Sequence, residues 1–220
     1  MCNRKHLTIS YLGGNVEKKG HHIAREASLI VSEEYTGLHG RDEYNAAVAH
    51  VCELIQASYS LFINGSFAPS LFLSITVFEE IAKIKAGHMR TWGEERTKVK
   101  RGKDPLFNHG KKHKISVDPI YLIGDRIANS IGAERAKEIF DGYESGKHSS
   151  LREESLYFSR TDKGLHIPSE KISPSLAAEH LLIAIEIFAD EFWGMTAEAS
   201  EICDTTDELY AEIEAELKSS

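Results

Sequence analysis

The chain of 220 residues contains an uncharged run of 14 residues, Gly65–Phe78, that ends in two glutamates, Glu79 and Glu80. Pro69 suits the first turn of a helix, where its missing N–H removes no hydrogen bond. Apolar side chains then surround most of the helix that we expect to run to about Trp92: Leu71, Phe72, Leu73, Ile75, Val77, Phe78, Ile81, Ala82 and Ile84. A helix that is apolar nearly all round has to be buried, so this segment is predicted to be the central helix of the fold. The run is shorter than the roughly 20 residues of a membrane span, and no membrane association is expected.

The segment before this helix also has the helical period. Apolar residues recur at i, i+3, i+4 and i+7 from Tyr44 to Phe62, Asp42 is a suitable N-cap, and Asn64-Gly65 is a suitable stop. The short link predicts an antiparallel pair of helices. Further helices are expected near 105–116, 119–131 and 133–143, over one or two turns within 151–158, from Pro174 onward, and over 205–217, where Thr205 and Glu208 have capping-box spacing.

Non-helical structure is expected only in small pieces. Leu7–Leu12 alternates like a short strand, and 23–35 predicts one short helix in an otherwise turn-rich region. The turn-prone Thr161–Gly164 segment predicts a β-hairpin near residues 157–168. The fold class is therefore all-α, a helical bundle with a small hairpin. We divide the chain into an irregular N-terminal extension (1–40), a helical domain (41–203) and an acidic C-terminal helix (204–220).

Charge is distributed unevenly along the chain. The formal net charge is −8, which excludes a general nucleic-acid coat. Residues 179–220 contain twelve acids and one base, a net of −11, so the rest of the chain carries +3. Eight bases against three acids give residues 94–114 a net charge of +5. That segment is either a solvated linker or a local binding site for phosphates.

The N-terminus lacks an apolar segment behind its positive charges, and we therefore expect no secretory signal. Cys2, Cys52 and Cys203 are odd in number and far apart. They favour free thiols in a reducing compartment, and a cytoplasmic location is predicted.

The sharpest local motif is Glu79-Glu80-Ile81-Ala82-Lys83, at the end of the apolar run. Glu79 and Lys83 have the i, i+4 spacing of an intrahelical ion pair, so we expect them to pair. Glu80 is turned about 100° away and needs another partner if it is buried. The alternative is that the helix simply reaches solvent at this point.

A second motif is Asn108-His109-Gly110-Lys111-Lys112-His113-Lys114. His109 and His113 share one helix face, a spacing that can hold a metal. Three lysines would repel a cation, however, and no metal or other cofactor is expected. A histidine among lysines suits an anion site, where it can exchange a proton beside a phosphate.

A third candidate pairs Arg160 with His166, with Arg152 and Tyr157 upstream. An arginine and a histidine together can bind a phosphodiester and move its proton. This spacing also arises by chance, and Gly164 argues against a shared helix.

The order of these motifs resembles that of the AbiV-type abortive-infection proteins of bacteria, a branch of the HEPN superfamily. Ser70–Lys83 resembles the family's Glu-Glu-x-x-Lys helix, and Phe107–Lys112 resembles its His-x-x-Lys motif. Leu151–Phe158, followed by Pro168 and the helix from Pro174, resembles its Arg/Tyr segment and closing helix. The similarity spans about residues 42–193.

The resemblance implies a HEPN-like helical bundle, a homodimer, and a role in defence against phage. Many HEPN relatives are metal-independent ribonucleases with an Arg-x(4–6)-His motif. The match in this chain, Arg160 to His166, lies in the predicted hairpin and not on a helix.

We therefore expect RNA or nucleotide binding and ribonuclease activity. His109, Glu80 and Lys83 are the predicted catalytic residues, with Glu80 orienting His109 or Lys83. The predicted binding residues are Glu79, Lys112, His113, Arg152, Tyr157, Arg160 and His166, with Lys83 and Lys112 holding phosphate. One alternative is a non-catalytic protein that binds a phage protein or the translation machinery. A weaker one is a metal-dependent hydrolase that uses His109, His113 and Glu79 or Glu80.

Overall fold

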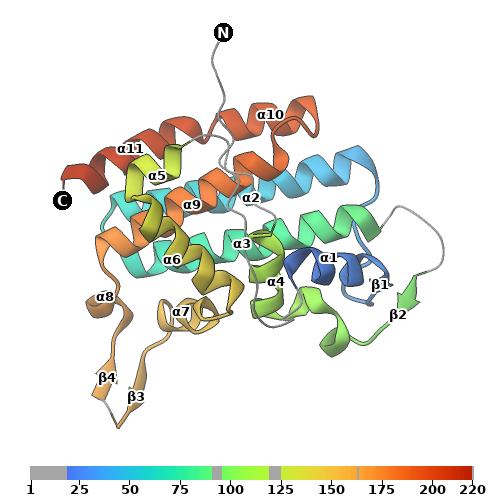
Figure 1. Ribbon diagram of the computed structural model, residues 1–220, viewed down its shortest axis with the longest axis horizontal. Helices are drawn as coiled ribbons and strands as arrows, with labels where there is room; N and C mark the ends of the chain where they lie inside the picture. Colours follow the sequence, from blue (N-terminus) through green and yellow to red (C-terminus); the bar gives the residue numbers. More distant parts are fainter. Residues whose placement is uncertain (1–18, 91–95, 119–124, 163, 220) are drawn as a thin grey trace.

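The computed structural model describes residues 19–90, 96–118, 125–162 and 164–219 (Figure 1). Helices account for most of these residues, and the strands form two small two-stranded sheets. The predicted all-α class is confirmed.

Three long helices form the centre of the described structure: α2 (Gly40–Ile63), α3 (Phe67–Arg90) and α9 (Pro174–Phe192). α3 packs against both of the others, and Leu71, Ile75 and Phe78 on it are fully buried. α2 and α3 form the predicted antiparallel pair, joined through Gly65, whose φ of 74° favours glycine. α2 is long and apolar enough to cross a membrane, but its apolar side packs against α3 and α9 as expected of a core helix.

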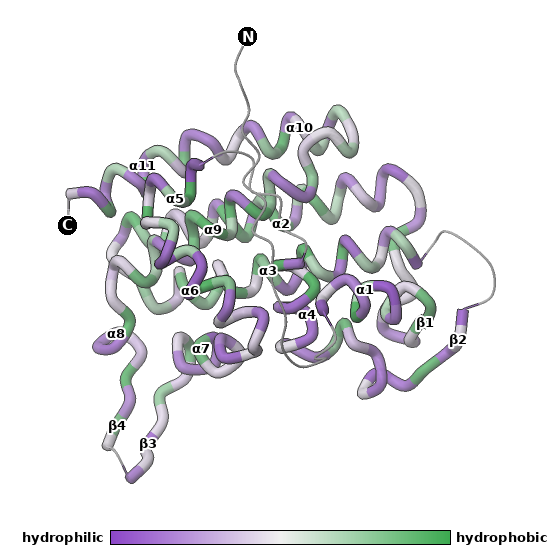
Figure 2. The backbone as a smooth tube through the Cα atoms, in the orientation of Figure 1, coloured by the Kyte–Doolittle hydropathy of each residue, from purple (hydrophilic) through white to green (hydrophobic). Residues whose placement is uncertain are grey.

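Shorter helices surround this core. α10 (Ala197–Asp204) and α11 (Asp207–Ser219) cover α2 and α9, and α5 (Arg126–Ile131) also packs on α9, beside α6 (Ala133–Glu144). α4 (His109–Ser116) and α7 (His148–Glu154) pack on α3 next to each other. In Figure 2, α9 is hydrophobic along most of its length, whereas hydrophilic and hydrophobic residues alternate on the outer helix α11. This contrast follows from burial of α9 on all sides and of α11 on one side.

The described N-terminal segment is tied to α3 by a buried arginine. α1 (Gly20–Ser28) packs on α3 and α4, and β1 (Ile30–Val31) pairs in parallel with β2 (Thr97–Lys98). Arg90 donates to the carbonyls of Ala27 and Tyr35 and to Asp104 Oδ1 at 2.6 Å. Both charged side chains are fully buried, and Ser32 donates to the second carboxylate oxygen. Such a pair is stable only when its remaining hydrogen bonds are satisfied, as they are here.

The predicted hairpin is present. β3 (Ser159–Thr161) and β4 (Gly164–His166) are antiparallel and project from the helical body (Figure 1). The short helix α8 (Pro168–Lys171), which the sequence analysis did not predict, returns the chain to α9.

Several predicted boundaries are wrong. α2 begins after His39 and not after Asp42, and the N-terminal helix covers Gly20–Ser28 and not 23–35. Asp104-Pro105 caps only the 3-10 turn η2 (Pro105–Phe107), after the turn η1 (Arg101–Lys103).

The remaining differences follow from local caps. Asn108 starts α4 by accepting from the Lys111 N–H, so the helix begins later than expected. α7 ends at Glu154, and Thr205 closes the unpredicted helix α10 instead of starting α11. The strand predicted over Leu7–Leu12 and the start of the helix predicted over 119–131 lie outside the described residues.

We predict that Asp104→Ala lowers the free energy of unfolding by about 3–5 kcal/mol, because it leaves the buried Arg90 without its counter-ion. Lys218→Ala, which breaks the more exposed pair with Glu214, is the control and should cost less than about 1 kcal/mol. Urea denaturation measures both values. Equal, small losses would show that the Arg90 pair does not anchor the N-terminal segment.

Candidate functional site

The candidate site is built around Glu79, which is only 2% exposed. It lies on the side of α3 that faces α4. His109 Nδ1 lies 2.7 Å from Glu79 Oε1, and Lys112 Nζ lies 2.5 Å from Oε2. His113 Nε2 and Arg152 Nε, the latter from α7, each lie 3.3 Å from Oε1. One carboxylate therefore joins three helices. We call these five residues the Glu79 cluster.

The start of α4 explains why these side chains meet. Asn108 fixes His109 as the first residue of the helix. Positions i, i+3 and i+4 lie on one helix face, so His109, Lys112 and His113 all point toward α3.

Glu79 is ionised at neutral pH. Burial raises its pKa, but His113, Lys112 and His109 outweigh burial and lower the pKa from 4.5 to about 2. Burial also lowers the pKa of Lys112, and Glu79 opposes that shift. The 2.5 Å contact between the two buried groups is a charge-assisted hydrogen bond.

His109 is the member of the cluster that solvent can reach most easily, with 46% of its side chain exposed. A carboxylate only accepts hydrogen bonds, so Nδ1 of a neutral His109 carries the proton that Glu79 accepts. No residue in the described ranges bonds to Nε2. The second ring nitrogen is therefore available to a ligand as a proton acceptor.

A stack of rings lies behind the cluster, with Tyr143, His113 and His180 buried and His148 partly buried. Tyr143 has its ring centroid 5.2 Å from His113, 4.6 Å from His148 and 5.5 Å from His180. Tyr143 Oη and His180 Nδ1 are 2.7 Å apart, and His148 Nε2 donates to the Ile139 carbonyl at 3.1 Å. A side chain at Gly142 would lie 2.1 Å from His148 Nε2, so only glycine leaves room for that ring.

Burial keeps this stack uncharged. It lowers the pKa of His113, that of His148 to about 4, and that of His180 well below the usual range. Among the described residues, neither ring nitrogen of His113 has a well-aligned hydrogen bond, although its Nε2 lies 3.3 Å from Glu79 Oε1, close enough to lower the pKa of that carboxyl. No local pattern relates Tyr143, His148 and His180, because they come from three segments with no common spacing.

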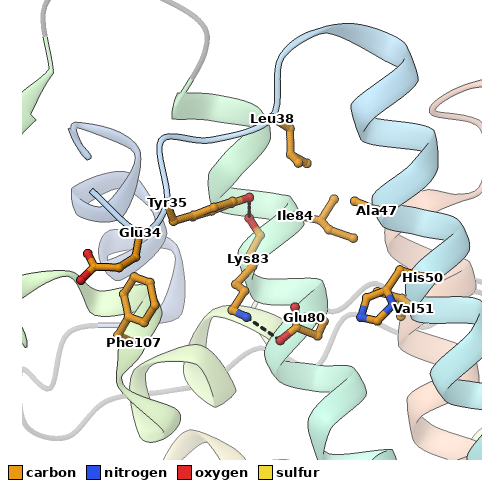
Figure 3. A pocket seen from close by; sticks show the side chains of 10 residues that line it. All are labelled: Glu34, Tyr35, Leu38, Ala47, His50, Val51, Glu80, Lys83, Ile84 and Phe107. Atoms are coloured by element: carbon orange, nitrogen blue, oxygen red, sulfur yellow. Dashed lines mark hydrogen bonds and ion pairs between the residues drawn. The ribbon is translucent and has the colours of Figure 1, made fainter. Parts of the chain in front are cut away.

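Glu80 and Lys83 do not belong to the Glu79 cluster. Lys83 Nζ lies 2.6 Å from Glu80, so the predicted Glu79–Lys83 pair is wrong. These two side chains line a pocket of about 220 Å³ with Tyr35, His50 and Phe107 (Figure 3). Glu80 and Phe107 are close in sequence to Glu79 and His109, so the pocket lies next to the cluster.

The hairpin residues do not join the cluster either. Tyr157 is 59% exposed, and His166 Nε2 donates to the Glu154 carbonyl at 2.7 Å. Arg160 pairs in register with Leu165, and His166 with Ser159. Neighbouring residues of a strand point to opposite faces, so Arg160 and His166 lie on opposite sides of the hairpin.

In the described part of the chain, no group of three or more His, Cys, Asp or Glu side chains is arranged so that it could hold a metal ion. Glu79, His109 and His113 do meet, but Lys112 and Arg152 already place their positive charge on that carboxylate. This arrangement suits an anion and not a cation.

The helical bundle, with its Glu/His/Lys/Arg cluster on α3, α4 and α7, has the character of a HEPN-type protein. The model of the AbiV family, HEPN_AbiV, matches residues 40–189, from the start of α2 into α9. The chain therefore belongs to the AbiV family, as its motifs predicted, and the family indicates an abortive-infection function of HEPN type. No curated protein and no solved structure gives a significant match.

We predict that Glu79→Ala lowers the free energy of unfolding by about 3–5 kcal/mol, because it leaves the buried Lys112 unpaired. Glu80→Ala removes the neighbouring carboxylate, whose pair with Lys83 is partly exposed, and should cost less than about 1 kcal/mol. Urea denaturation compares the two. A larger loss for Glu80→Ala would mean that the wrong glutamate has been placed at the centre.

We also predict that His148 makes the protein sensitive to acid. Its pKa is about 4 in the folded chain and near 6.5 in the unfolded chain, so unfolding takes up a proton between these values. Stability is therefore lost as the pH falls from 6.5 to 4. His148→Gln keeps a donor for the Ile139 carbonyl. It should reduce the change of unfolding free energy with pH by up to about 1.4 kcal/mol per pH unit. If urea denaturation shows that the free energy of unfolding depends on pH equally in wild type and His148→Gln, a neutral, partly buried His148 is contradicted.

Proposed function

We propose that this AbiV-family protein binds RNA at the Glu79 cluster and cleaves it without a metal ion, with His109 as the general base. The observation that carries the proposal is the 2.7 Å contact between Glu79 and His109 Nδ1, while no described residue bonds to the other ring nitrogen. A buried carboxylate that orients a half-exposed imidazole is a suitable arrangement for proton transfer.

In the proposed reaction, His109 Nε2 removes the proton from a ribose 2′-hydroxyl. The 2′-oxygen forms a bond to the adjacent phosphorus, and the bond from phosphorus to the 5′-oxygen breaks. The imidazolium returns the proton to the leaving 5′-oxygen, which gives a 2′,3′-cyclic phosphate and a 5′-hydroxyl. Arg152 and Lys112 supply positive potential beside the phosphate.

The geometry changes the roles that the sequence suggested. Glu79, and not Glu80, contacts His109, so we assign it as the positioning residue. Lys112 is buried against Glu79 and acts through its field. Lys83 faces the neighbouring pocket, where it can contact a ligand directly (Figure 3). The homodimer and the cytoplasmic location stay predictions.

A second function has an observation of its own in its favour. The cations of the site already pair within the chain: Lys112 with Glu79, Lys83 with Glu80, and Arg152 with Glu153 at 2.7 Å. In this alternative the charges only tie α3, α4 and α7 together. The protein would then act by binding a phage protein or the translation machinery.

We predict that His109→Ala lowers the rate of RNA cleavage by about 10²–10⁴-fold, the usual contribution of a general base, and removes protection against phage. The control is His166→Ala. His166 lies in the hairpin, outside the Glu79 cluster, so this substitution should leave the cleavage rate unchanged. Protein from a ribonuclease-deficient host is incubated with a labelled RNA oligonucleotide and EDTA. An all-DNA oligonucleotide should stay intact, because it lacks the 2′-hydroxyl.

The alternative makes the opposite prediction. If the wild-type protein leaves RNA intact, and His109→Ala still folds and protects against phage, the catalytic proposal is wrong and the binding function remains.

A further inference from the structure

A row of exposed cations lies between Glu79 and His109 in the chain. Lys98 ends β2, and Lys100, Arg101 and Lys103 follow through the 3-10 turn η1. All four residues are exposed, and none forms an ion pair with any residue that the structure describes. The guanidinium of Arg101 instead lies 4.4 Å over the ring of Phe107. Neighbouring charges of one sign repel each other, and binding of a polyanion relieves that repulsion.

Three of these cations line one wall of a groove of about 640 Å³. The groove is lined by Lys98, Lys100 and Arg101 and by the segment Val31–Thr36, which contributes Glu33 and Glu34. Glu34 also lines the pocket of Glu80 and Lys83, so the two hollows are neighbours that share this residue. Figure 3 shows Glu34 beside Phe107 at the edge of that pocket.

The path thus leads from exposed cations to an aromatic pocket and then to the cluster. Tyr35 and Phe107 present rings in the pocket, and Tyr35 is held by its hydrogen bond to the Lys83 carbonyl at 3.0 Å. Gly87 makes that placement of Tyr35 possible, since a side chain there would lie 1.9 Å from Tyr35 Oη. Glu80 and Phe107 of this pocket are one and two residues away in sequence from Glu79 and His109, which brings the pocket next to the cluster.

We propose that this groove, from Lys98 to Lys83, is a binding track for single-stranded RNA. Phosphates contact Lys98, Lys100 and Arg101, and a base stacks on Phe107 in the pocket. Proteins that bind single strands combine a basic groove with aromatic side chains in this way. A duplex keeps its bases stacked inside and cannot place one in the pocket. The proposal deepens the proposed function and rests on it for the identity of the polyanion.

Glu33 and Glu34 oppose the phosphates from the other wall. They confine favourable contacts of the RNA backbone to the Lys98–Arg101 side. They also allow a test of the direction in which the affinity for RNA changes. Removing a charge from the basic wall should weaken binding, whereas removing one from the acidic wall should strengthen it.

The test is the affinity for a fluorescein-labelled 12-nucleotide oligouridylate as a function of salt concentration, with full-length protein that carries His109→Ala to prevent cleavage. The double substitution Lys100→Ala/Arg101→Ala should lower the slope of log K against log salt by about 1.4, or roughly 0.7 for each phosphate contact. Glu33→Gln should raise the affinity. Phe107→Leu, which keeps an apolar side chain but removes the stacking face, should lower it by about tenfold. Lys171→Ala, an exposed lysine on α8, is the control and should change nothing.

The outcomes separate the track from the proposed catalysis. A slope that the double substitution leaves unchanged overturns the track, even if His109 proves essential for cleavage. No measurable binding of the oligonucleotide also overturns it. A reduced slope supports the track, even if the wild-type protein proves unable to cleave RNA.

Discussion

Glu79 imposes the central constraint on this structure, because a carboxylate buried inside a helical bundle needs positive partners at short range. Those partners come from α4 and α7, which are short helices. α4 has few apolar residues of its own, so packing alone holds it weakly. The same contacts that satisfy Glu79 therefore fix α4 on α3 and give His109 its orientation. Stability and the candidate chemistry depend on one side chain.

Glu79 and Glu80 are adjacent in sequence and differ in environment because successive helix residues are turned by about 100°. Glu79 faces α4 and the ring stack, and its pKa falls to about 2. Glu80 faces the pocket with Lys83, where both side chains keep some exposure. This division leaves one glutamate in contact with His109 and the other in contact with Lys83 in the pocket. The proposed RNA track enters from the Glu80 side.

The sequence predicted what depends on periodicity and on local motifs. The run of apolar residues from Leu71 to Ile84 identified the central helix, and the family's His-x-x-Lys motif pointed to His109 and Lys112. The rule for i, i+4 pairs failed for Glu79 and Lys83, because it ignores partners from other helices. Nothing in the spacing of Tyr143, His148 and His180 relates them, since only the packing of α6, α7 and α9 brings them together. Tertiary contacts of this kind are absent from local sequence patterns.

The most direct test of the central claim is the tautomer of His109, measured by long-range ¹⁵N–¹H correlation spectroscopy of the imidazole rings. The account predicts that neutral His109 carries its proton on Nδ1, held by Glu79, and that Glu79→Gln or Glu79→Ala removes this preference. A wild-type His109 that carries its proton on Nε2 would contradict the account, because the nitrogen facing the ligand could then accept no proton.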